Sequence, residues 1–240
     1  MKQGGLILAG FVLIFASMLP LAADSEVNYQ TYMVDTFDTT EEWTWEAVGS
    51  KFVTEGYPVL KFFDGMPHAV RVMQSDPDAE YRFMGVQFKF NRQGDNWVDI
   101  VPMKDGKNYE IPLKGIVNRF DLWVWGAGYL YSMEMLVRDC NGRVHVLPLG
   151  PLNYQGWKNL AVKVPTNIPQ ASKYLSNVKY MSFVAFRIRT SPMERVDDFY
   201  IFIDQFKALT NVFVNSYDGF ELEKANFQEE NSNNEGESGK

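Results

Sequence analysis

Cysteine is almost absent from this 240-residue chain, because Cys140 is the only one. A single thiol cannot form an internal disulfide, so the folded state must be stabilised by a packed core. The composition suits such a core, since 46% of the residues are hydrophobic and 15% are aromatic. A chain of this length can build one core, and we predict one folded domain.

Basic residues and histidines are also scarce. The chain has 23 Lys and Arg against 30 Asp and Glu, a formal net charge of -7, and only two histidines, His68 and His145. It therefore lacks the basic surface that nucleic-acid binding requires. A lone histidine on a strand is most often a hydrogen-bonded structural residue, and no GxSxG, HExxH or phosphate-binding glycine loop is present. We predict that the protein is not an enzyme and has no cofactor and no metal site.

Long apolar runs are absent except near the N-terminus. There, Lys2 is followed by an apolar run from Leu6 to Leu19, then by Pro20 and the small residues Ala22 and Ala23. This order is typical of a secretory signal peptide. The run is shorter than the roughly 20 residues of a membrane-spanning helix, which favours cleavage over an N-terminal anchor. We predict that residues 1–23 are a signal peptide and that no membrane segment remains after cleavage.

Short runs of alternating apolar and polar residues follow along the chain, separated by Gly, Pro, Asn and Asp turns. Such a pattern predicts an all-β fold, an antiparallel two-sheet β-sandwich of the jelly-roll type, over residues 24–220. The expected strands are Thr31–Phe37, Val59–Phe63, Ala69–Met73, Phe83–Phe90, Trp97–Val101, Tyr109–Leu113, Arg119–Trp125, Tyr131–Arg138, Val144–Leu149, Trp157–Val164, Met181–Ile188 and Phe199–Phe206.

Two further segments differ from this pattern. Ile168–Val178 predicts one short helix or turn between strands. Residues 221–240 form an acidic polar tail with no apolar residue after Phe227. A segment of that composition cannot bury enough apolar surface to offset the entropy of ordering, so the tail is expected to be disordered.

The segment from Arg119 to Gly150 is unusually apolar, and its first strand has two different faces. Side chains alternate along a strand, so Phe120, Leu122 and Val124 share one face. The other face carries Trp123 and Trp125, which a solvated sheet face would not normally show. Large aromatics are usually buried, so a second covered layer is one interpretation.

An exposed aromatic platform is the other interpretation of this segment. Gly126 and Gly128 permit a sharp turn that would place Tyr129 near the sheet edge. Exposed aromatics can stack on a sugar ring or pack against another protein. We predict a protein-contact patch of Trp123, Trp125 and Tyr129. Downstream, Asn141 and Gly142 predict a hairpin that pairs Tyr131–Arg138 with Val144–Leu149.

Several segments together resemble known families. "RFDLWVWGAGYLYSMEMLVRDCNGRVHVLPLGPLNYQGWKNLAVKVP" and "DDFYIFIDQFKAL" resemble jelly-roll modules of the galactose-binding type, the fold of many carbohydrate-binding modules. The wider order of "VDTFDTTEEWTWEAVGS", "PHAVRVM", "GVQFKFNRQGDNWVDIVP" and "FYIFIDQFKALTNVFVNSYDG" resembles the flagellar filament outer-layer, or sheath, proteins of spirochaetes, the FlaA family. The resemblance covers about Val34 to Phe220 and contains no catalytic signature.

The resemblance to the sheath proteins implies a structural subunit that coats a flagellin core in flagella rotating within the periplasm. Expected partners are flagellin subunits, other coat proteins and neighbouring copies of itself. The resemblance does not indicate which of these partners the chain contacts directly, or whether the coat contains one protein or several.

Two alternatives to the sheath role stay open. The first is a secreted carbohydrate-binding module, in which Asp121 or Arg138 would bind sugar hydroxyls. The second, ranked last, is a glycoside-processing enzyme. Jelly-roll modules of the galactose-binding type often hold a structural calcium, for which Asp38 and Asp204 would be the residues to suspect. Solvated surface acids are the favoured interpretation, because no contiguous loop supplies six to eight oxygens.

Overall fold

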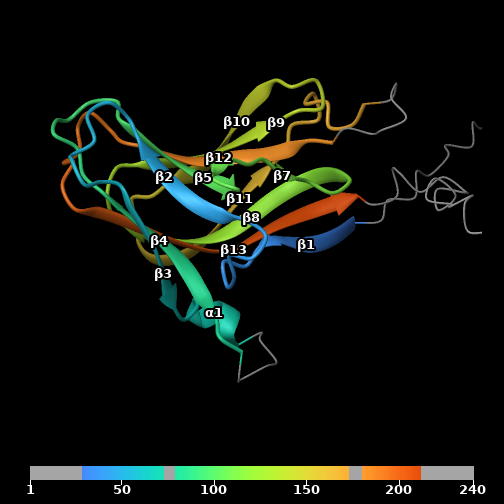
Figure 1. Cartoon of the computed structure of the whole chain (residues 1–240), viewed down its shortest axis with the longest axis horizontal. Helices are drawn as coiled ribbons and strands as arrows, with labels where there is room; N and C mark the ends of the chain where they lie inside the picture. The colour runs from blue at the N-terminus through green and yellow to red at the C-terminus, as the bar shows by residue number, and fades with distance from the viewer. Residues whose placement is uncertain (1–28, 73–78, 173–179, 212–240) are drawn as a thin grey trace, which may run out of the picture.

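The computed structural model describes residues 29–72, 79–172 and 180–211, and these form two antiparallel β-sheets packed face to face (Figure 1). The predicted all-β sandwich is therefore confirmed. The signal peptide, the acidic tail and residues 173–178 of the predicted helix lie outside the described residues.

The first sheet, called sheet A below, has the strand order β11-β8-β13-β4-β3, and β1 also pairs with β13. Its strands are β1 (Tyr29–Asp35), β3 (Val59–Asp64), β4 (Arg82–Phe88), β8 (Ile116–Ala127), β11 (Gln155–Lys163) and β13 (Phe199–Asn211). Every pairing is antiparallel. Because β13 is long, β4 pairs with its first half and β1 with its second half, on the same side.

The second sheet, sheet B, has the order β10-β9-β12-β5-β2, with the short strands β6 and β7 paired to β5 and β12. Its strands are β2 (Thr44–Gly49), β5 (Trp97–Lys104), β6 (Lys107–Asn108), β7 (Ile111–Pro112), β9 (Ser132–Arg138), β10 (Val144–Pro151) and β12 (Ser182–Arg189). The predicted hairpin is present, since β9 and β10 pair antiparallel across the turn that contains Gly142 at φ 89°.

The sequence pattern located most of the strands, and three segments differ from it. Ala69–Met73 was expected to be a strand, but His68–Arg71 forms the helix α1 directly after Pro67. This helix lies beside β3 and β4 at one end of the molecule (Figure 1). Thr44–Gly49 was missed and is β2. Residues 168–172 of the predicted helix form no helix; Ala171 is instead bridged to Tyr180.

The core lies between the two sheets and is rich in aromatic rings. Buried side chains alternate along the strands, and in β8 Phe120, Leu122 and Val124 are fully covered. Phe206 from sheet A contacts Phe183 and Phe186 from sheet B, with ring centroids 5.0 and 5.1 Å apart. Contacts of this kind hold the two sheets together. The chemical character of each outer face then depends on the side chains that point outward.

Within the described ranges, no helix has the length and apolar character needed to cross a membrane.

Candidate functional site

The outer face of sheet A carries a continuous cluster of aromatic side chains, called the aromatic face below. Its members point away from the core because each lies on the strand face opposite to the residues that pack into the core. They come from five adjacent strands: Phe63 on β3, Phe83 on β4, Tyr200 and Phe202 on β13, Trp125 on β8 and Trp157 on β11. Phe63 and Tyr200 are each 42% exposed, and the others are half-buried.

The strand register explains why these rings meet. Trp157 lies opposite Trp125, which lies opposite Phe202, which in turn lies opposite Gly85 on β4. Gly85 is needed there, because an added Cβ would come within 2.6 Å of the Phe63 ring and 2.8 Å of the Phe202 ring. The missing side chain therefore lets the two phenyl rings close over the backbone of β4.

The rings of the aromatic face contact one another rather than standing apart. Trp125 stacks on Tyr200 with centroids 5.2 Å apart and an interplanar angle of 16°. Phe83 meets Phe202 at 5.3 Å and Trp157 at 5.5 Å, both edge to face. Phe83 and Trp157 belong to strands with β13 and β8 between them, so the side chains must lean together over the sheet.

A shallow groove runs along one side of the aromatic face. It has a volume of about 280 Å³ and is lined by Val59, Lys61, Phe63, Gly85, Val86, Gln87, Tyr200 and Phe202. Most of these side chains are apolar, and Lys61 and Gln87 supply the polar groups. An exposed apolar surface with a polar border is typical of a protein-contact site.

The predicted contact patch is divided by the fold. Trp123 and Trp125 lie on the outer face of sheet A, as the alternation in this strand predicted. Tyr129 is instead only 6% exposed, and its ring packs against Tyr131 and Phe199 in the core. Its hydroxyl donates a hydrogen bond to the Asp197 carbonyl oxygen at 2.9 Å. Tyr129 therefore offers almost no surface to a partner.

Most of the aromatic face was not identified from the sequence. Phe63, Phe83, Trp157 and Tyr200 lie on predicted strands, so their outward direction could have been read from the alternation with buried neighbours. Their meeting could not, because it depends on the strand order. Arg138, suggested as a sugar-binding partner of the tryptophans, lies on β9 of sheet B and pairs there with Glu110 at 2.8 Å.

The two histidines have different surroundings. His145 on β10 has Nε2 2.7 Å from Oδ2 of Asp139, whose Oδ1 accepts the N–H groups of Asn141 and Arg143. Burial alone would raise the pKa of Asp139, but the bonds from His145 and the two N–H groups together lower it. His145 thus joins the hydrogen bonds that hold the hairpin turn, while His68 is exposed on α1.

Asp204 is the one suspected calcium ligand that is buried. It is 1% exposed; Oδ1 accepts the Gln205 N–H at 2.7 Å, and Oδ2 has no partner. Burial, with smaller contributions from the nearby Asp38 and Asp35, raises the pKa of Asp204 to about 8, although the Gln205 N–H bond and Lys207 act in the opposite direction. The interpretation of Asp204 as a solvated acid is therefore wrong.

The other carboxylates near Asp204 do not complete a calcium site. Both oxygens of Asp35 already accept N–H groups, and Oδ1 of Asp38 accepts the Arg82 N–H. In the part of the chain that the structure describes, no group of three or more acidic, His or Cys side chains could hold a metal ion. These residues do not fit calcium, which requires six to eight oxygen ligands.

The sequence matches known proteins over most of its length. The sequence model of a family described as flagellar filament outer layer protein FlaA matches residues 26–218. A flagellar filament outer layer-like protein of Brachyspira hyodysenteriae is 24% identical over 186 residues, which are 78% of this chain and 81% of that protein. A flagellar filament outer layer protein of Borreliella burgdorferi is 27% identical over 95 residues, 36% of this chain and 28% of that protein.

Among solved structures, a family 11 carbohydrate-binding module of a cellulosomal cellulase of Clostridium thermocellum is similar, with 13% identity and a TM-score of 0.40. The match covers 76% of this chain and 95% of that module.

Proposed function

The chain belongs to the FlaA family of flagellar filament outer layer proteins, and on that premise we propose that it is a structural subunit of the layer that coats a flagellin core. The coat would surround a flagellum in the periplasm, to which a signal peptide exports the protein. Its partners would be flagellin subunits, other coat proteins and neighbouring copies. A coat held by many such contacts would stiffen the filament, fix its shape and so contribute to motility.

The aromatic face is the observation that supports this role. An isolated soluble domain has no need to place aromatic side chains from five adjacent strands on one outer surface, because that surface remains in water. Covering it by a neighbouring protein removes apolar area from water and provides the aromatic anchors that dominate protein contacts. We assign Trp123 and the aromatic face to such a contact and leave Tyr129 out, because it is buried.

The arrangement of the rings favours a protein over a sugar at the aromatic face. A sugar needs an open aromatic face on which to stack. Trp125 instead has Tyr200 stacked on it at 16°, and Phe202 meets it edge to face at 5.5 Å. The cluster therefore presents a packed, irregular apolar surface that suits a complementary protein surface.

The decisive experiment compares two serine variants in flagellated cells. Trp125→Ser removes the centre of the aromatic face, whereas Val146→Ser removes an apolar side chain that is 50% exposed on β10 of sheet B. We expect Trp125→Ser to fold and be exported but to decrease this protein on detergent-resistant flagella at least about tenfold, equivalent to about 1.4 kcal/mol of contact free energy. Val146→Ser should coat filaments normally.

Two further results bear on the proposal. If Trp125→Ser misfolds, the more exposed Tyr200→Ser variant tests the same surface with less risk to the fold. Normal coating by every correctly folded aromatic-face variant would refute the contact role of this surface. Recovery of the wild-type protein only in the soluble periplasm, never with flagella, would refute the coat role itself.

A further inference from the structure

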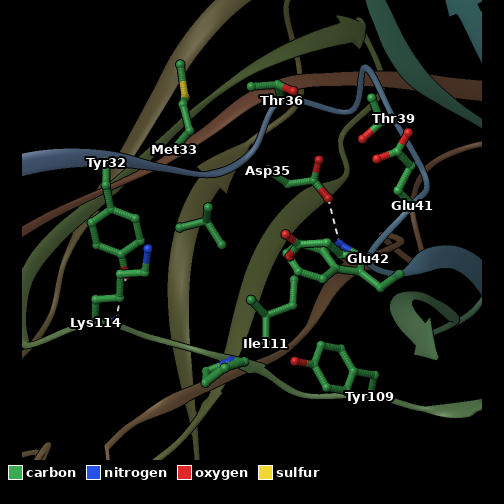
Figure 2. Close-up of a pocket in the computed structure, with 13 residues that line it drawn as sticks. Tyr32, Met33, Asp35, Thr36, Thr39, Glu41, Glu42, Tyr109, Ile111 and Lys114 are labelled. Atoms are coloured by element: carbon green, nitrogen blue, oxygen red, sulfur yellow. Dashed lines mark hydrogen bonds between the residues drawn. The ribbon is translucent and has the colours of Figure 1, made fainter. Parts of the chain in front are cut away.

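A second concave site lies away from the aromatic face, between the edges of the two sheets. The cleft has a volume of about 430 Å³, which is within the range of small-molecule sites. One wall is the end of β1 with the loop after it, and the other is formed by β7 with its neighbours (Figure 2). Its lining residues are Tyr32, Met33, Val34, Asp35, Thr36, Thr39, Glu41, Glu42, Trp43, Tyr109, Ile111, Pro112 and Lys114.

A buried carboxylate fixes an indole ring in this cleft. Oδ2 of Asp35 accepts the Nε1–H of Trp43 at 2.7 Å and that of Trp45 at 2.9 Å, and Oδ1 accepts the Phe37 N–H at 2.6 Å. Figure 2 shows the Asp35 side chain directed into the cleft toward the indole that it binds. Trp43 also stacks on Tyr109 with centroids 5.9 Å apart. The half-buried Trp43 ring is thus held rigid before any ligand arrives.

Unused hydrogen-bonding groups surround this ring. Glu41, Glu42 and Thr39 are exposed, and Figure 2 places Thr39 and Glu41 together at one rim. Neither glutamate forms an ion pair or a side-chain hydrogen bond with another described residue, and Asp35 is already saturated by N–H donors. The cleft therefore combines a fixed aromatic surface with carboxylate and hydroxyl groups that can accept hydrogen bonds.

Charged groups of both signs surround the cleft, and the cations already cover two of its aromatic rings. Lys114 lies over the Tyr32 ring at 5.6 Å and Lys104 over the Tyr109 ring at 5.2 Å, so protein cations already occupy these aromatic faces. A cationic ligand therefore finds neither ring free for a cation–π contact. An anion would be repelled by Glu41 and Glu42 at the rim. A neutral ligand with apolar C–H faces and several hydroxyl groups can use both the indole and the rim acceptors without opposing either charge.

We propose that this cleft binds a neutral saccharide, with the face of the Trp43 indole turned away from Tyr109 as the stacking surface and with Glu41, Glu42 and Thr39 as hydroxyl acceptors. The site shares no lining residue with the aromatic face, so it is independent of the contact that coats the filament. A coat subunit with such a site can hold a glycan on a neighbouring protein or on the surrounding wall while the aromatic face packs against the filament.

The test uses the full mature protein and a panel of neutral probes: cellotetraose, β-1,4-galactotriose, mannotetraose and chitotetraose. Binding is measured by calorimetric titration up to about 10 mM sugar. We expect at least one probe to bind, Trp43→Ala to weaken that binding at least about tenfold, and the double variant E41A/E42A, which removes both acceptors, to weaken it by a smaller factor. Trp125→Ala is the matched control, since it removes an aromatic ring of the other surface.

Several outcomes would overturn the proposal. No binding of any probe by the folded wild-type protein is one. Another is binding that Trp125→Ala abolishes and Trp43→Ala leaves unchanged, because the sugar would then lie on the aromatic face. Should Trp43→Ala disturb the fold, the double variant E41A/E42A decides alone, since both glutamates are exposed and their removal should not disturb the core. Unchanged affinity in that folded double variant would then refute the site.

Discussion

The outer faces of the two sheets present different kinds of side chain to water. On sheet B, charged side chains neutralise one another: Arg187 binds Asp99 at 2.6 Å, and Arg189 binds Glu134 at 3.0 Å. On sheet A, aromatic rings gather at the equivalent place. The ion-paired face is complete in water, whereas the aromatic face gains free energy only when a second molecule covers it.

Two buried carboxylates show the same contrast. Asp139, at the end of β9 in sheet B, has His145 and two backbone N–H groups as partners. Asp204 of sheet A lies opposite Trp123 on β8, is buried, and keeps one oxygen without a partner. Sheet A therefore carries two features that cost stability, exposed aromatic area and a buried carboxylate oxygen without a partner, whereas these charged groups of sheet B are paired.

Asp204→Asn should change the pH dependence of stability most. The folded-state pKa of Asp204 is raised to about 8, so only the unfolded chain ionises this group between about pH 4 and pH 8. Wild-type stability should therefore fall across that range as the pH rises. The Asn side chain cannot ionise, so the variant lacks this loss. We expect the difference in the free energy of unfolding between variant and wild type to increase in favour of the variant by on the order of a few kcal/mol from pH 4 to pH 8. Urea unfolding at several pH values measures it.

Asp139→Asn is the control of opposite sign. The pKa of Asp139 is lowered in the folded state, so its stabilisation is present above the unfolded pKa and is lost as the pH falls through the folded one. The variant should lose stability at neutral pH and little in acid. Equal pH slopes in the two variants would contradict the distinction between paired and unpaired carboxylates.

Gly85→Ala should disturb the aromatic face. The added Cβ would lie 2.6 Å from a Phe63 ring atom and 2.8 Å from one of Phe202, so the two rings must separate. We expect a loss of about 1–2 kcal/mol by urea unfolding, together with weaker filament coating. Gln87→Ala, on the same strand and face, should cost less than about 0.5 kcal/mol. Equal losses of stability in Gly85→Ala and Gln87→Ala would mean that the contacts among the rings make no specific contribution to stability.

Asp99→Asn should weaken sheet B without affecting the coat. The Asp99 and Arg187 side chains are only 14% and 21% exposed, so the substitution leaves a largely covered guanidinium without its charged partner. We expect a loss of about 1–2 kcal/mol in urea unfolding and normal coating of filaments. A coating defect in this folded variant would show that the ion-paired face also contacts a neighbour.

Asp95→Asn should have the smallest effect. Asp95 is 72% exposed and 3.6 Å from Arg189, which already binds Glu134. Water and salt screen such a pair, so the free energy of unfolding should change by less than about 0.5 kcal/mol. A larger loss would mean that the charges of sheet B act as one network.

The sequence located most of the strands because a half-buried strand alternates between apolar and polar residues. The same rule failed for Ala69–Met73, where a short apolar run forms α1, since periodicity alone cannot separate a helical turn from a strand. It also missed Thr44–Gly49, which follows the acidic segment at Glu41 and Glu42. Trp123 and Trp125 were correctly placed on the outer face, but Tyr129 turned inward after Gly128.

The order of apolar, polar and turn-forming residues along the chain sets the local features: which segments extend, where they turn, and which face of each strand is apolar. Membership of the outer layer family is also carried by the sequence, over residues 26–218. Which strands become neighbours depends on the tertiary fold. That order brings Phe63, Phe83 and Trp157 together, and it leaves Oδ2 of Asp204 buried without a partner, because side chains far apart in the chain meet only when the sheet forms.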